Sequence, residues 1–252
     1  MDIQTTFKRY EIKYILTKQQ KDELIGLLEE YMIPDTFGET TIRNIYFDTD
    51  TYRLARRSIE KPVYKEKLRI RSYSQVSSED IVFVELKKKY RSVVYKRRLA
   101  LAEEEAMKWM NGGICPVQGQ IASEIDYFYH YYETLHPTAF ISYDRQAFYS
   151  ESDRNFRVSF DENIMSRQED LSLTMEPGGS LLLGGDCVVM EIKTSGGIPL
   201  WLAHFLTERK IYKTHFSKYG TAYREQIFPC KTDVWTLGKD TDYEDEEEMA
   251  YA

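Results

Sequence analysis

Residues 63–101 contain three consecutive β-type runs, VYKEKLRIRSY (63–73), DIVFVELKKK (80–89) and SVVYKRRLAL (92–101). A Ser-rich stretch separates the first two runs, and Tyr90-Arg91 separates the last two closely enough for a hairpin. Because the side chains of a strand alternate between its two faces, Lys67, Arg69 and Arg71 share one face. The segment therefore predicts neighbouring strands with one strongly basic face.

The same alternation places charged side chains together on one face of seven predicted strands. On most of these strands the opposite face is apolar, as Leu68 and Ile70 illustrate. The sets are Arg9, Glu11 and Lys13; Lys67, Arg69 and Arg71; Glu85, Lys87 and Lys89; Lys96 and Arg98; Tyr143 and Arg145; Arg157, Ser159 and Asp161; Glu191 and Lys193.

A solvated polar face is the ordinary explanation for any single one of these strands, since antiparallel sheets often expose one side to water. Several of the faces, however, are nearly pure Lys and Arg. Clustered like charges are unfavourable unless an anion compensates them. The set of strands therefore predicts a shared polyanion site.

Composition and charge indicate a globular protein with a focused anion site. The 252 residues are 42% hydrophobic and 14% aromatic, which suits a strand-rich fold with a full core. The net charge of -7 argues against a nucleic-acid-binding protein. Basic residues concentrate between 61 and 98, whereas acidic residues crowd the end of the chain. We expect one domain over residues 1–239 and a disordered acidic tail over 240–252.

The sequence offers no signal for secretion or for a membrane span. The three cysteines are scattered and predict neither a disulfide framework nor a cysteine metal site. No apolar run reaches about 18 residues, and the first residues lack a signal-peptide pattern. We therefore expect a cytoplasmic protein without a membrane span of its own.

Helices are expected between the strands, which makes the fold α+β. Further strands are predicted at 6–16, 40–47, 138–149, 156–161 and 186–194, and helices at 18–31, 102–111, 119–135, 200–210 and 218–226, with Pro137 ending the third helix. A closed or nearly closed antiparallel barrel decorated by helices fits this order best.

Phosphate chemistry suits the residue types of the basic faces. Arg binds phosphate oxygens in pairs through its planar guanidinium, and Lys adds a mobile point charge. Phosphoryl transfer needs positioning, charge neutralisation and a metal ion that bridges phosphate oxygens. Glu191 is the first candidate metal ligand, followed by Glu11 and Glu85. Each of the last two has the alternative of a simple ion pair with a neighbouring lysine.

The chain resembles the VTC domain, the polyphosphate polymerase branch of the triphosphate tunnel metalloenzyme (CYTH-like) superfamily. The resemblance covers about residues 7–224 and rests on the order and spacing of short motifs. These are Arg9-Tyr-Glu-Ile-Lys13-Tyr, Asn44-Ile-Tyr-Phe-Asp48, Lys67-Leu-Arg-Ile-Arg71, Phe83-Val-Glu-Leu-Lys87, Lys96-Arg-Arg98, Tyr143-Asp-Arg145, Arg157-Val-Ser-Phe-Asp161, Val189-Met-Glu191-Ile-Lys193 and Phe216-Ser-Lys218-Tyr.

The resemblance implies a closed antiparallel eight-stranded β tunnel with flanking helices, which binds ATP and inorganic polyphosphate with Mn²⁺ or Mg²⁺. It implies transfer of the γ-phosphate of ATP to a growing polyphosphate chain, and coupling to transport would require a membrane-protein partner. The implied catalytic phosphate ligands are Lys13, Arg69, Arg71, Lys87, Lys96, Arg145 and Arg157. Further substrate contacts are expected from Lys67, Lys89, Arg98, Tyr143, Ser159, Lys193, Ser217 and Lys218, and metal ligation from Glu191, Glu11 and Glu85.

Two other functions remain open at this point. One is an inorganic triphosphatase of the same fold, and the other is a module that binds polyphosphate or another polyanion without turnover. The wider superfamily often begins with Glu-x-Glu-x-Lys, whereas this chain has Arg9 at the first Glu position. That difference favours the polymerase branch.

Overall fold

The computed structural model describes residues 10–60, 62–91 and 93–229. Arg9 and the predicted acidic tail therefore lie outside the described residues. The strands are β1 (Tyr10–Thr17), β2 (Ile33–Pro34), β3 (Thr40–Asp48), β4 (Tyr64–Ser72), β5 (Ile81–Tyr90), β6 (Val93–Ala102), β7 (His136–Tyr149), β8 (Arg157–Arg167), β9 (Ser180–Leu181), β10 (Cys187–Thr194) and β11 (Lys213–Thr214). The helices are α1 (Lys18–Tyr31), α2 (Arg53–Ile59), α3 (Glu103–Met110), α4 (Gln120–Tyr131), α5 (Leu200–Glu208), α6 (Lys218–Ala222) and the π-helical turn η1 (Tyr223–Ile227).

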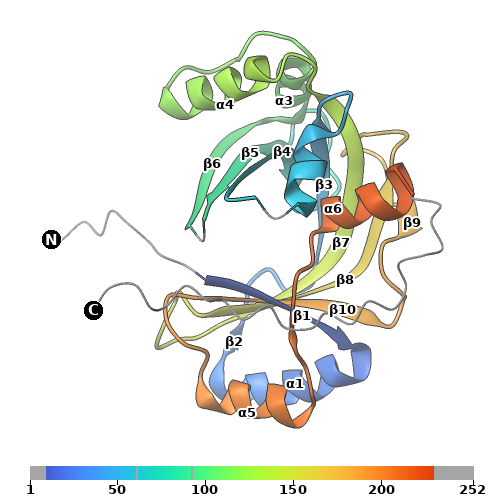
Figure 1. The fold of residues 1–252 in the computed structure, drawn as a ribbon. Coiled ribbons are helices and arrows are strands. Elements are labelled where there is room, and N and C mark those ends of the chain that lie inside the picture. Colours follow the sequence, from blue (N-terminus) through green and yellow to red (C-terminus); the bar gives the residue numbers. More distant parts are fainter. Residues whose placement is uncertain (1–9, 61, 92, 230–252) are drawn as a thin grey trace, which may run out of the picture.

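One antiparallel sheet forms the body of the protein and curls strongly on itself (Figure 1). Its order is β11-β1-β10-β8-β7-β3-β4-β5-β6, with β2 added to β7 and β9 added to β8. Eight long strands, from β1 to β6 along this order, correspond to the eight expected. The α+β class is confirmed.

The predicted closure of the barrel is not confirmed, because no backbone pairing of the described residues joins β6 to β1. The outer edge of β1 is instead paired with β11, through Lys13 with Thr214 and Tyr14 with Lys213. An edge strand presents unpaired N–H and C=O groups that need a partner. The short β11 supplies that partner for part of β1, and the sheet remains open beside it.

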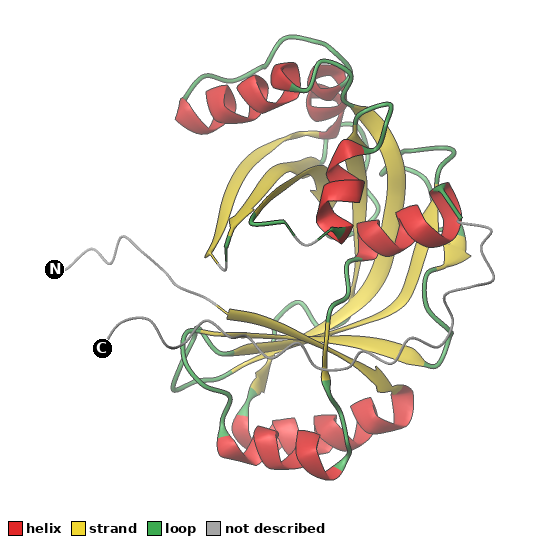
Figure 2. Cartoon of the chain, in the orientation of Figure 1, coloured by secondary structure: helices red, strands yellow, loops and turns green. Residues whose placement is uncertain are grey.

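Helices cover the outer face of the curved sheet at both of its ends (Figure 2), and the side chains of this face are apolar. Leu68, Ile70 and Val84 pack with α3 and α4 around the buried Trp109. At the other end of the sheet, Val158 and other apolar side chains of β1, β8 and β10 pack against α1 and α5. These two packed layers leave the concave side, here called the interior face, to the polar side chains.

A third apolar cluster occupies part of the interior face itself. Tyr46 and Ile141 from the sheet meet Phe216 and Tyr219, which come from the segment that leads into α6 and from α6. This cluster places α6 against β7 and α2. The first residues of α6 consequently reach the charged part of the interior.

Pro137 plays a different part from the one expected. The helix predicted to extend to residue 135 ends at Tyr131, and Pro137 lies inside β7. The register between β3 and β7 shifts there, because Tyr46 pairs with Ala139 while Phe47 pairs with Pro137. A proline is tolerated within a sheet at such a bulge, where a ladder hydrogen bond is already missing.

Candidate anion site

Three adjacent strands bring four basic side chains around Glu85. Arg69 of β4 and Arg98 of β6 lie directly opposite Glu85 of β5, one on each side. The Glu85 carboxylate is 1% exposed and forms ion pairs with Arg69 (2.7 Å), Lys96 (2.6 Å) and Arg98 (2.6 Å). Arg71 approaches within 3.9 Å. Burial alone would raise the pKa of Glu85, but the surrounding cations hold it well below its ordinary value.

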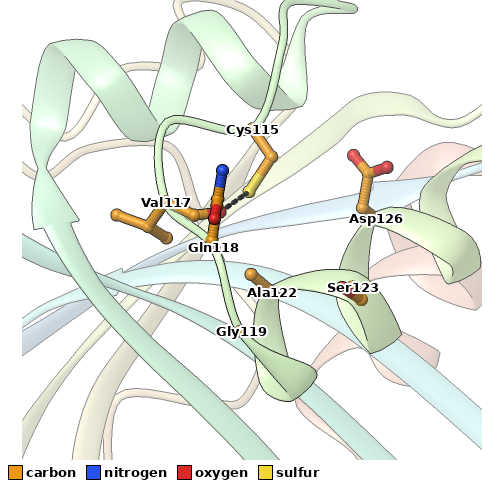
Figure 3. A pocket seen from close by; sticks show the side chains of 7 residues that line it. All are labelled: Cys115, Val117, Gln118, Gly119, Ala122, Ser123 and Asp126. Carbon is orange, nitrogen blue, oxygen red and sulfur yellow. Dashed lines mark hydrogen bonds between the residues drawn. The ribbon is translucent and has the colours of Figure 1, made fainter.

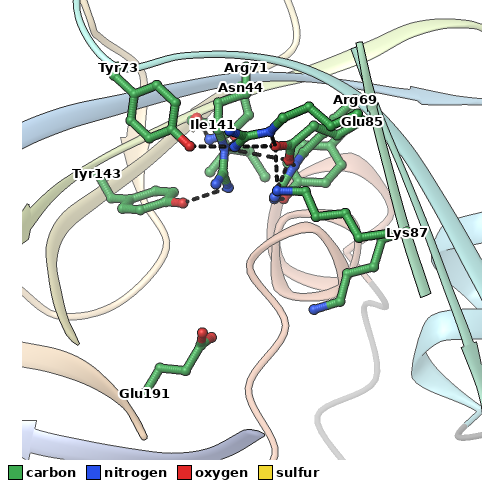
Figure 4. Close-up of polar contacts among 12 residues, drawn as sticks. Asn44, Arg69, Arg71, Tyr73, Glu85, Lys87, Ile141, Tyr143 and Glu191 are labelled. Atoms are coloured by element: carbon green, nitrogen blue, oxygen red, sulfur yellow. Dashed lines mark hydrogen bonds and ion pairs between the residues drawn. The ribbon is translucent and has the colours of Figure 1, made fainter. Parts of the chain in front are cut away.

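Arg71 is fixed by neutral groups rather than by a close carboxylate. Its Nε donates to Asn44 Oδ1 (2.9 Å) and its Nη2 to the Tyr143 hydroxyl (3.0 Å), as Figure 4 shows. Arg69 Nη1 donates in the same way to the Tyr46 hydroxyl (3.1 Å). Although burial would raise the pKa of Tyr143, Arg71 and other nearby cations lower it to about 8. Two guanidinium groups are thus held on one wall of the interior.

Asp161 of β8 organises a second group of cations, which come from β7 and α6. Its carboxylate is fully buried and accepts hydrogen bonds from Arg145 Nε (2.6 Å) and Arg145 Nη2 (2.8 Å). Lys218 at the start of α6 forms an ion pair with the same carboxylate. Burial would raise the pKa of Asp161, but Lys218 and Arg145 lower it to about 2.

Strands β1 and β10 contribute a third group, which contains two carboxylates. Lys13 lies opposite Glu191, and its Nζ is 3.6 Å from both Glu191 and Glu11. Lys193 forms an ion pair with Glu191 (2.6 Å). Burial opposes ionisation, but the lysines lower the pKa of both carboxyl groups, so that both are charged at neutral pH. Ser159, which is also buried, lies opposite Glu191 on β8.

Side chains bridge the interior where backbone pairing does not close it. Lys87 of β5 forms an ion pair with Glu11 of β1 (3.0 Å). Lys67 of β4 donates to Ser217 Oγ (2.8 Å), and no carboxylate of the described residues lies within ion-pair distance of it. Burial, together with Lys13 and Lys87, lowers the pKa of Lys67 well below its ordinary value.

Two of the residues expected in the site lie at its margin. Arg157 is on the same face of β8 as Ser159, but its guanidinium forms an ion pair with Asp35 (2.6 Å) and its side chain is 47% exposed. Lys89 lies near the end of β5, opposite Lys65. The other predicted side chains are brought together on the interior face.

Sequence reasoning missed three residues of the site. Asp161 was placed on the correct face but given no role, although it holds two cations. Asn44 and Tyr46 alternate along β3 toward the interior and position Arg71 and Arg69. Their alternation with the apolar Ile45 and Phe47 was the available signal.

Metal binding at this site has to rely on few protein ligands. In the described parts of the chain, no group of three or more His, Cys, Asp and Glu side chains is arranged to hold a metal ion. Glu11 and Glu191, however, flank the same lysine, and Figure 4 shows Glu191 across the interior from Arg69 and Arg71. Mg²⁺ typically takes one or two carboxylates and completes its shell with water and substrate phosphates. Glu11 and Glu191 fit that pattern better than Glu85, because their partners are the mobile ammonium groups of Lys13, Lys87 and Lys193. Glu85 is 1% exposed and is enclosed by three arginines and Lys96.

A hollow on the outside of the fold does not share this chemistry. It lies between the loop after α3 and helix α4, has a volume of about 400 Å³, and is lined by Cys115, Val117, Gln118, Gly119, Ala122, Ser123 and Asp126 (Figure 3). Its lining contains one carboxylate and no basic side chain. It is therefore unsuited to an anion.

Replacing Asp161 with Asn tests how far this carboxylate stabilises the fold. A group whose folded-state pKa is depressed stabilises above its unfolded pKa of about 3.9, and the contribution disappears as pH falls toward about 2. We expect D161N to lower the free energy of unfolding by about 3 kcal/mol at pH 7, since Arg145 and Lys218 lose their partner. Urea denaturation between pH 7 and pH 3 measures this, and the difference from the wild type should shrink at the acidic end.

D35N is the matched control for that measurement, because Asp35 forms an ion pair of the same length with the half-exposed Arg157. Exposed pairs contribute about 0–1 kcal/mol. Equal losses for D161N and D35N would contradict the role given to Asp161.

Comparisons with known proteins agree on a fold and a family. A model of the VTC domain matches residues 8–226. A "putative adenylate cyclase" from Bacillus halodurans is 17% identical, with a TM-score of 0.52, covering 83% of this chain and 95% of its own. A "putative adenylyl cyclase" from Hippeastrum, described as having a dominant triphosphatase activity, is 15% identical, with a TM-score of 0.51 over 86% of this chain and 95% of its own. No curated protein gave a significant match.

The two structural matches establish the similarity of fold alone, since both are below 20% identity. The family model, over residues 8–226, spans the motifs that build the interior face. The chain belongs to the VTC domain family.

Proposed function

We propose that the interior face binds ATP and inorganic polyphosphate and transfers the γ-phosphate of ATP to the end of the polyphosphate chain. The observation that carries the proposal is the charge of this face. Ten basic side chains meet four carboxylates there, a formal excess of six positive charges. The basic residues are Lys13, Lys67, Arg69, Arg71, Lys87, Lys96, Arg98, Arg145, Lys193 and Lys218, and the acids are Glu11, Glu85, Asp161 and Glu191.

An excess of this size in a partly buried site requires a compensating anion. The cations come from six strands and one helix, so they surround a volume rather than line a surface strip. A chain of phosphates matches such a volume, because each unit presents oxygens to a different side chain. Arg69 and Arg71 supply guanidinium N–H groups from one wall, and Lys87 and Lys13 supply ammonium groups from others.

In the proposed reaction, a terminal oxygen of polyphosphate attacks the γ-phosphorus of ATP. A new P–O–P bond forms, the bond between the γ-phosphorus and the β,γ-bridging oxygen breaks, and ADP leaves with that oxygen. The protein orients both phosphate chains in line and neutralises the charge on the transferred group. Bound Mn²⁺ or Mg²⁺, held by Glu191 and Glu11, would neutralise further charge on phosphate oxygens. Glu85 and Asp161 keep the arginines in place.

The direct test is to incubate the protein with ATP and Mn²⁺, and separately with tripolyphosphate and Mn²⁺. We expect ADP and long-chain polyphosphate from ATP, detected by ³¹P NMR and gel electrophoresis. Free phosphate from tripolyphosphate without chain growth would identify a triphosphatase instead. Binding without turnover would identify a polyanion-binding module, and either result overturns the proposal.

Arg71→Ala and Arg97→Ala provide matched variants for this assay. Arg71 is on the interior face, whereas Arg97 lies on the outer face of β6 and forms an ion pair with Glu124 (2.6 Å). R71A should lose at least a hundredfold in turnover, and R97A should retain it.

Replacing Glu191 with Gln tests the metal role separately from anion binding. The substitution removes the charge but keeps the side-chain size next to Lys13 and Lys193. We expect E191Q to lose Mn²⁺-dependent turnover while tripolyphosphate measured without metal binds at least as tightly as in the wild type, because a negative charge has gone. Full turnover by E191Q would remove this residue from the metal site.

Lys67→Met should separate binding from stability. The folded-state pKa of Lys67 is lowered, so the folded protein binds the lysine proton less tightly than the unfolded chain does. At pH values below the unfolded pKa of about 10.4, Lys67 therefore destabilises the protein when no anion is bound. We expect K67M to raise the free energy of unfolding by about 1 kcal/mol at pH 7, with the gain shrinking toward pH 10. Tripolyphosphate affinity should fall about tenfold.

Lys18→Met is the control, because Lys18 is exposed at the start of α1 and its loss changes the net charge equally. Thermal denaturation and calorimetric titration of both variants give the comparison. A destabilised K67M with unchanged affinity would contradict the position of Lys67 in the site.

A further inference from the structure

Two sequence motifs contain residues that the proposed chemistry does not use, Asp48 at the end of β3 and Tyr219 in α6. The structure joins them directly. The Tyr219 hydroxyl donates to Asp48 Oδ2 (2.8 Å), across 171 positions of the chain. Asp48 is 0% exposed and Tyr219 is 1% exposed. Residues buried this completely and this far apart in sequence fix the relative position of two elements.

Asp48 is a firm point of attachment. Its Oδ1 accepts the backbone N–H groups of Thr49 and Leu54, and its Oδ2 accepts that of Ala55. The bonds from Leu54 and Ala55 satisfy orphan donors in the first turn of α2. The carboxylate is therefore held at the junction of β3 and α2, and its Oδ2 also accepts the hydrogen bond from the Tyr219 hydroxyl.

The other contacts of Tyr219 lead to the wall that carries Arg69. Its hydroxyl is 2.9 Å from Thr138 Oγ1, which in turn is 3.1 Å from the carbonyl oxygen of Tyr46. The two tyrosine rings stack, with centroids 4.8 Å apart and planes at 5°. The Tyr46 hydroxyl receives Arg69 Nη1. Tyr219 thus supports the ring that positions a guanidinium group.

Tyr219 also follows two residues that enter the site, the N-cap residue Ser217 and Lys218, the first residue of α6. Lys218 pairs with Asp161, and Ser217 accepts a hydrogen bond from Lys67. Helix α6 has five residues and is too short to hold itself in place. The helix packs closely on α2 at Gly220. A Cβ atom at this position would lie 3.4 Å from Cγ1 of Ile59 in α2 and 3.2 Å from Oγ of the N-cap residue Ser217.

We propose that Tyr219 is a positioning residue: its hydroxyl anchors α6 to Asp48 and Thr138, and this anchor holds Ser217 and Lys218 in the interior. It acts through these neighbours and need not touch the anion itself. The affinity test below rests on the proposed function only in assuming that the interior binds tripolyphosphate, while the exchange test does not depend on it.

The affinity test is a double-mutant cycle of Tyr219→Phe with Lys218→Met, measured by calorimetric titration with tripolyphosphate. Y219F keeps the stacked ring and loses the hydroxyl. We expect Y219F to weaken binding about tenfold in the wild-type background and less than twofold in the K218M background, because the anchor acts through Lys218. A general loss of stability would give the same factor in both backgrounds. An equal factor, or unchanged affinity in folded Y219F, overturns the proposal.

Amide hydrogen exchange tests the anchor without any ligand. The N–H of Gly220 is bonded to Ser217 Oγ and the N–H of Thr221 to the Ser217 carbonyl. In Y219F both should exchange at least tenfold faster, while amides in β4 and β5 keep their rates. Unchanged exchange in α6 would overturn the proposal, even if the protein proved not to bind tripolyphosphate.

Tyr223→Phe is the control for both measurements. Tyr223 lies in η1, its ring packs against Tyr52, and among the described residues its hydroxyl forms no hydrogen bond with Asp48 or Lys218. The substitution should leave affinity and α6 exchange unchanged. If Y219F fails to fold, Thr138→Val removes one contact of the same hydroxyl, and it should accelerate α6 exchange in the same direction.

Discussion

Repulsion among ten basic side chains on one concave face is the constraint on which the rest of this structure depends. Three buried carboxylates, Glu85, Asp161 and Glu191, each form ion pairs with cations from two different elements of the fold. Such pairs repay the cost of burying charge only when geometry and additional hydrogen bonds are good. The neutral partners Asn44, Tyr46 and Tyr143 supply those bonds to Arg69 and Arg71. The compensation is incomplete, and the remaining positive charge defines what the interior can bind.

The fold separates this charge from the apolar core by the alternation of strand side chains. Leu68 and Ile70 face the helices, while Lys67, Arg69 and Arg71 face inward from the same strand. The large helices pack on the outer face, so the interior is polar except where the third apolar cluster and α6 occupy it. Where the backbone leaves the sheet open, Lys87 reaches Glu11 and Lys67 reaches Ser217. The enclosure at that edge is therefore made by the residues proposed to bind phosphate, and it can adjust when they engage a ligand.

Most of the interior residues were predictable, because the face of the sheet to which a strand side chain points follows from its odd or even position along the strand. This alternation placed Glu85 beside Lys87 and Glu191 beside Lys193 on the correct face. Parity does not say which groups pair, so the engagement of Glu85 by four cations and the turn of Arg157 toward Asp35 were not predictable. The edge pairing of β1 with the two-residue β11, and the contact between Asp48 and Tyr219, depend on tertiary packing between distant segments. Pro137 lies within a strand because the pairing of β3 with β7 is irregular there, and the local sequence does not predict this bulge.

The proposed function requires that the interior hold a chain of phosphates. A crystal structure of the protein with tripolyphosphate and Mn²⁺ would examine that claim most directly. We predict that the anion lies on the interior face, with its oxygens within hydrogen-bond distance of Arg69, Arg71 and Lys87, and that Mn²⁺ lies against Glu191. An anion bound only to the outer surface, with the interior cations still paired as they are now, would contradict the account.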